Sequence, residues 1–189
     1  MSGEDILHQR GAALESQFFA AVDAKLMADL QAELKKSDDA KALAGVSGIN
    51  DLAVLDALVE AGVSPSTFPA LRLFPLVAIA WADGLLEKSE RETVLAAADK
   101  HSVGLNSPSG GILAAWLAKE PGPELFVAWE AFAKALVSKL NISDAKSLRD
   151  VILKEVNDVA QASGGLLGWG AISKGESEVA NRIEQAMTP

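Results

Sequence analysis

The chain has no cysteine, no tyrosine and only two histidines among its 189 residues. Without cysteine it can form no disulfide, no zinc–thiolate site and no iron–sulfur cluster, and it has no thiolate nucleophile. The motifs His-Glu-x-x-His and Gly-x-Ser-x-Gly are also missing, so the usual residues of zinc peptidases and serine hydrolases are absent. These absences predict a protein that is not an enzyme.

Long runs of basic residues are missing as well. The longest is Lys35-Lys36, and the formal net charge is −9, from 17 basic and 26 acidic residues. Nucleic acids and anionic membrane surfaces attract proteins through clustered positive charge, so neither is an expected partner. An acidic surface can still attract cations or a basic protein.

The chain also lacks a long apolar run. The uncharged stretch at residues 73–82 is far shorter than the roughly 20 residues that span a bilayer, so we expect no membrane span. The first five residues, Met-Ser-Gly-Glu-Asp, are acidic and do not resemble the basic start of a cleaved signal peptide. The sequence therefore predicts a cytoplasmic protein.

Aromatic residues make up 5% of the chain, whereas hydrophobic residues make up 49%. The core must then consist mainly of Ala, Leu, Val and Ile, which favours closely packed helices over a sheet. We predict an all-α fold, a compact multi-helix bundle that begins with a long amphipathic helix. We place an N-terminal extension packed on the core at residues 1–66 and the helical domain proper at residues 67–189, and we expect the two to form one folding unit.

The N-terminal helix is predicted over residues 5–36 from an apolar residue at every fourth position: Leu14, Phe18, Val22, Leu26, Leu30 and Leu34. A spacing of four drifts around an α-helix, so this row winds about the axis. The expected role is packing along the body of the domain. The alternative is pairing with a partner helix, which would make a homodimer.

Further helices are predicted from cap residues and apolar periodicity. Ser37-Asp38-Asp39 reads as a set of caps that starts a new short helix at residues 41–44. Pro75 lies inside a nearly continuous apolar segment and should split it near Phe74. The other expected helices cover residues 52–61, 87–102, 112–118, 124–140, 143–162 and 174–186. Asn50 or Asp51 should cap the first of these, and a helix start is expected at Ser107-Pro108.

The most informative stretch is the acidic turn Ala80-Trp81-Ala82-Asp83-Gly84-Leu85-Leu86-Glu87-Lys88-Ser89-Glu90. Compared with the calcium loop of an EF-hand, Gly84 would make the bend, and Asp83, Glu87 and Glu90 would supply oxygen ligands. The first two ligand positions, however, fall on Ile79 and Trp81, which have no side-chain oxygen. This excludes a self-sufficient EF-hand, so a cation would need oxygens from elsewhere. The simpler interpretation is a glycine stop followed by the acidic first turn of the next helix.

The same turn resembles the signature A-D-G-x-[IL]-[DE]-x-x-E of the TerB-like family, which is associated with tellurite resistance. The resemblance covers the second half of the chain. It implies an all-helical core, and it implies that Asp83, Glu87 and Glu90 can bind a divalent cation such as calcium, magnesium or manganese.

The end of the chain partly repeats the residue spacing of this turn. Gly84, Leu86 and Glu90 correspond in spacing to Gly170, Ile172 and Glu176, with Trp169 in the place of Asp83. If the two turns lie side by side, Glu176 can complete a carboxylate site with Asp83 and Glu90. The alternative is that both glutamates only cap their helices, since Ser173 and Glu176 have the spacing of a capping box.

Three functions follow from these observations. The leading one is a non-enzymatic TerB-like protein that binds a divalent cation at Asp83, Glu87, Glu90 and Glu176 and acts through protein contacts in a stress response. The alternative is a metal-free interaction or scaffold module. A carboxylate-dependent hydrolase is a third possibility, and it would need a deep polar cleft around Asp83.

Overall fold

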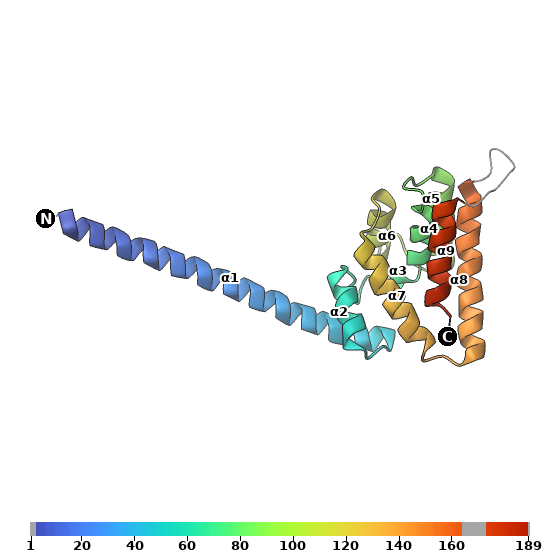
Figure 1. The fold of residues 1–189 in the computed structure, drawn as a ribbon, viewed down its shortest axis with the longest axis horizontal. Coiled ribbons are helices and arrows are strands. Elements are labelled where there is room, and N and C mark those ends of the chain that lie inside the picture. The colour runs from blue at the N-terminus through green and yellow to red at the C-terminus, as the bar shows by residue number, and fades with distance from the viewer. Residues whose placement is uncertain (1–2, 164–172, 189) are drawn as a thin grey trace. The chain divides into compact units, whose positions relative to one another are not determined.

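The structure, a computed structural model, describes the backbone of residues 3–163 and 173–188 and the side chains of residues 25–162 and 173–188. All regular elements in these ranges are helices, which confirms the all-α prediction (Figure 1). The chain divides into two compact units, Met1–Asp38 and Asp39–Pro189. The sequence predicts a boundary after residue 66, and the structure has residues 39–66 in the second unit.

The first helix, α1, runs over Gly3–Ser47 without a break. The predicted interruption at Ser37-Asp38-Asp39 is therefore wrong. These residues cap a helix only where the chain leaves helical geometry, and inside a helix each costs no more than about 0.7 kcal/mol relative to alanine. Strong helix formers flank them on both sides, and Ala40 and Leu43 are buried in the second unit, which stabilises the continuous helix.

The second unit contains eight further described helices: α2 (Leu52–Glu60), α3 (Phe68–Leu71), α4 (Phe74–Ala80), α5 (Lys88–Lys100), α6 (Pro108–Ala118), α7 (Pro123–Val137), α8 (Ile142–Ser163) and α9 (Lys174–Ala186). Several predicted caps are confirmed. Asp51 caps α2, Ser107 caps α6 and Ser173 caps α9, each through a side-chain oxygen that accepts a backbone N–H.

Helix α4 is the centre of the second unit, and all seven of its residues are buried. The predicted split at Pro75 is confirmed, because α3 ends at Leu71 and α4 begins at Phe74 with the proline in its first turn. Helices α5, α8 and α9 pack against α4 (Figure 1). The acidic turn follows directly after this helix, so the turn starts from a rigid, fully packed element.

No single helix in the described ranges is long and apolar enough to cross a membrane. One bent pair, residues 25–47 of α1 together with α2, meets the criteria of length and composition only when its two parts are counted together.

Candidate functional site

The acidic turn is held by short-range hydrogen bonds and one anchor to the core. Gly84 has a φ of 83°, a left-handed conformation that glycine adopts without strain. The Asp83 Oδ1 atom accepts the Leu85 N–H at 2.9 Å. The Trp81 indole Nε1–H donates to the Trp116 carbonyl at 2.9 Å and fixes the start of the turn on helix α6. Asp83 itself is exposed at the surface.

Helix α5 begins with a reciprocal capping box between Glu87 and Glu90. The Glu87 N–H donates to the Glu90 Oε2 atom at 2.9 Å. Glu90 is only 4% exposed, whereas Glu87 is exposed. The capping interpretation of these two glutamates is therefore confirmed, and Glu90 is the buried acid of the pair.

Helix α9 begins with a second capping box, between Ser173 and Glu176. The Ser173 N–H donates to the Glu176 Oε2 atom at 2.5 Å, and the Glu176 N–H donates to the Ser173 Oγ atom at 3.1 Å. Glu176 is 8% exposed. The end of the chain thus repeats the arrangement at α5, a buried glutamate in the first turn of a helix.

The two capping boxes lie next to each other. A Cβ atom added to Gly175 would overlap the Ala82 carbonyl oxygen and would lie 3.1 Å from its carbonyl carbon and 3.8 Å from the Asp83 nitrogen. The first turn of α9 therefore rests directly on the acidic turn. Glycine is required at this contact because any side chain would push the two backbones apart.

We call Asp83, Glu87, Glu90 and Glu176 the carboxylate cluster. Burial raises the pKa of Glu90 from its ordinary 4.5 to about 7, against the opposing effect of its hydrogen bond from the Glu87 N–H. The negative charges of Asp83, Glu87 and Glu176 raise this pKa further. The other three predicted site residues therefore all act on Glu90.

The cluster in its described arrangement works as a pair of helix caps. Asp83, Glu90 and Glu176 each use one oxygen to accept a backbone N–H. Within the described side chains, no group of three or more acidic or histidine residues is arranged to hold a metal ion. A cation would need water or a rotated carboxylate to complete its shell. The repeated spacing at the end of the chain also includes Trp169, Gly170 and Ile172, which lie outside the described residues.

A second constellation, at the other end of α5, was not predicted. His101 caps the C-terminus of this helix, and its Nε2 atom lies 2.9 Å from both carboxylate oxygens of Glu155 on α8. The Lys100 Nζ atom lies 2.6 Å from Glu155 Oε1. Burial acts to raise the pKa of Glu155, but the hydrogen bonds and positive charges of Lys100 and His101 outweigh it and lower the pKa. The sequence placed His101 at a helix end, but a partner 54 residues away leaves no local pattern.

His101 also lines an apolar pocket of about 470 Å³ between α3, α7 and α8. We call this cavity the apolar pocket. Its lining consists of Phe68, Pro69, Leu71, Arg72, His101, Val103, Trp129, Phe132, Ala133, Leu136, Leu148, Ile152 and Met187. The sequence does not predict this pocket, because its walls come from segments far apart in the chain. Each segment alone has the apolar pattern of an ordinary core helix.

Comparison of the chain with protein-family models, with curated proteins and with solved structures found no match. The TerB-like resemblance at the acidic turn therefore stays a prediction.

Proposed function

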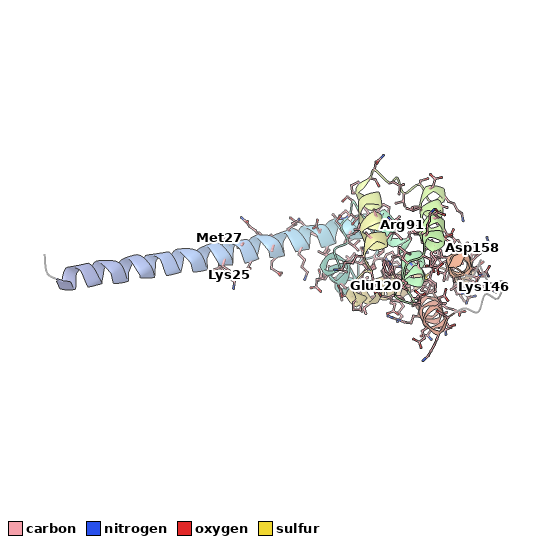
Figure 2. All side chains as sticks on the ribbon, turned by 90° about the horizontal axis from the view of Figure 1, so that it is seen from above. Lys25, Met27, Arg91, Glu120, Lys146 and Asp158 are labelled. Atoms are coloured by element: carbon pink, nitrogen blue, oxygen red, sulfur yellow. The ribbon has the colours of Figure 1, made fainter. Side chains whose placement is uncertain are left out.

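We propose that the chain is a non-enzymatic helical protein that acts through protein contacts, and that α1 is the contact surface that pairs with a second copy. The observation that carries the proposal is a row of apolar side chains on α1. Leu26, Met27, Leu30 and Leu34 are 54–64% exposed. Met27 is labelled in Figure 2. These residues belong to the unit Met1–Asp38, whose described part is a single helix.

A single helix has no core of its own, so its apolar side chains stay in contact with water unless another surface covers them. Such an exposed apolar row is typical of an interaction site. Leu26, Met27, Leu30 and Leu34 follow helical spacing and share one face of about 100°. The charged residues of this stretch are three lysines and two acids: Lys25, Lys35, Lys36, Asp29 and Glu33. Two copies can approach here with little repulsion, although the whole chain carries a charge of −9.

The double variant Leu30→Gln with Leu34→Gln is expected to convert a concentration-dependent dimer into a monomer. Glutamine is nearly as good a helix former as leucine, so the substitutions remove apolar area and leave helix propensity almost unchanged. The mass in solution, measured by light scattering coupled to size-exclusion chromatography over a hundredfold range of concentration, tests this.

The matched control is Ala28→Gln with Ala32→Gln, which has the same spacing on the opposite face of the same helix. Both alanines are exposed. This variant should dimerise as the parent does. A parent chain that is monomeric at every concentration, or a control that dissociates as readily as the leucine variant, would contradict pairing through this row.

A second candidate function is the binding of a divalent cation at the carboxylate cluster. Burial is the main cause of the raised Glu90 pKa, and the negative charges of Asp83, Glu87 and Glu176 raise it further. A bound cation would relieve that repulsion, which favours this function. This is also the chemistry that the TerB-like resemblance implies. The hydrolase alternative is not carried forward, because Asp83 is exposed on the turn and not set in a deep cleft.

Calorimetric titration of the chelator-stripped protein with calcium, magnesium and manganese at pH 8 tests the cation proposal. An ion that binds the folded state should stabilise it by about 2.7 kcal/mol at a hundredfold excess over Kd. The effect should vanish in Asp83→Asn with Glu90→Gln and persist in Glu92→Gln, which removes an exposed acid from the same helix. Absence of heat and of stabilisation with all three ions would leave the four acids as capping residues only.

A further inference from the structure

The apolar pocket has the size and lining of a small-molecule site. Its volume of about 470 Å³ falls within the range of about 300–1,000 Å³ that is typical of ligand pockets. Three aromatic residues, Phe68, Trp129 and Phe132, contribute to its walls, and the Phe68 and Phe132 rings meet edge to face at 5.5 Å. Apart from two residues, the lining offers only apolar side chains.

Those two residues are Arg72 and His101. Arg72 lies in the break between α3 and α4, which Pro75 causes. Its side chain is exposed, and no described residue forms a hydrogen bond or an ion pair with it. A guanidinium without an acidic partner at an apolar pocket can receive a carboxylate through two parallel N–H bonds.

His101 is held rigidly in the wall. Its side chain is 7% exposed, and the Glu155 carboxylate fixes it through Nε2. Glu155 is itself satisfied by Lys100 and His101, so it does not compete for Arg72. Nδ1 of His101 has no hydrogen-bond partner among the described residues, so His101 is a second lining residue with hydrogen-bonding capacity left.

We propose that the apolar pocket binds a small amphipathic carboxylate, an acyl chain whose tail packs among the aromatic residues and whose carboxylate pairs with Arg72. The walls select an apolar tail, because a polar group placed there would lose its hydrogen bonds to water. The unpaired cation selects a negative head group over a neutral or positive one. This site is separate from the α1 surface and from the carboxylate cluster, so it adds a ligand to the proposed function.

Calorimetric titration of the full chain with decanoate, decanol and decyltrimethylammonium tests the proposal, with each compound kept below the concentration at which it aggregates. The three probes share the tail and differ in the charge of the head group. Decanoate should bind, decanol should bind about tenfold more weakly through the loss of a charge-assisted hydrogen bond, and the cation should bind more weakly still. Failure of decanoate to bind, or equal affinity for all three, would overturn the proposal.

Arg72→Gln should weaken decanoate binding about tenfold and leave decanol binding unchanged. The matched control is Lys134→Gln, an exposed lysine of α7 outside the lining, which removes the same charge from the chain's overall field. Leu136→Trp should fill the pocket and abolish binding of both compounds, while circular dichroism confirms that the helices remain. If the Arg72 and Lys134 variants lost affinity for decanoate equally, the net charge of the chain would explain the loss and the proposed pairing with Arg72 would be wrong.

Discussion

Glu90→Gln is expected to stabilise the protein by about 1–3 kcal/mol at pH 8.5 and to have little effect at pH 4. The carboxyl of Glu90 is buried in the company of three other acids, and its pKa is raised to about 7. Glutamine can accept the Glu87 N–H as the glutamate does, since Glu and Gln both occur at this position of a capping box. It does so without a negative charge.

The direction of this pH dependence follows from the Glu90 pKa values in the folded and unfolded states. In the folded protein the Glu90 pKa is about 7, above its ordinary value of 4.5. Below pH 4.5 the carboxyl is protonated in both states, and its contribution to stability is fully present. Between pH 4.5 and 7 the unfolded chain loses this proton while the folded chain keeps it, so the free energy of unfolding falls as the pH rises to the folded pKa of about 7. Above pH 7 the loss is constant.

Urea unfolding of the parent and the variant at pH 4, 6 and 8.5 measures this difference. Glu92→Gln removes an exposed acid from the same helix and should show no such trend with pH. Parallel stability curves for the parent and Glu90→Gln across this range would show that the buried carboxyl does not carry the pH dependence.

Gly175→Ala is expected to destabilise the protein by about 2–3 kcal/mol. The new methyl group would overlap the Ala82 carbonyl oxygen, which belongs to the backbone and cannot rotate away. The first turn of α9 would have to move off the acidic turn, and Glu176 would move away from Glu90. Thermal or urea unfolding measures the loss.

Gly111→Ala is the matched control. Gly111 lies in α6, and a Cβ atom there would meet nothing within 4 Å. This substitution should stabilise the protein by up to about 1 kcal/mol, because alanine is the better helix former. If Gly175→Ala stabilised the protein as Gly111→Ala does, helix propensity and not the contact with Ala82 would explain the result at Gly175.

The parts of the fold that depend on local chemistry could be predicted from the sequence. Asp51, Ser107 and Ser173 cap helices as expected, and Pro75 splits its segment where its missing N–H requires. Residues 37–39 show the limit of this reasoning. Their side chains favour a cap, but burial of the residues that follow decides in favour of a continuous helix, and burial is not visible in a local pattern.

The same limit applies to the candidate sites. The spacing of the acidic turn indicated Asp83, Glu87 and Glu90, and the matching spacing at the end of the chain indicated Glu176. That the start of α9 rests on the acidic turn depends on the contact between Gly175 and Ala82, which are 93 residues apart in sequence and form no local pattern. The pairing of His101 with Glu155 and the apolar pocket are likewise products of tertiary packing.

The contact of α9 with the acidic turn also links two sets of amide hydrogens. The Glu87 N–H is protected by Glu90, and the Ser173 N–H is protected by Glu176. Because the two helix ends rest on each other, opening of one exposes the other. Both amides should then show a common protection factor against deuterium exchange, and it should fall as Glu90 ionises. The last helix and the start of α5 would then unfold locally as one cooperative unit, and alkaline solution would release this unit first.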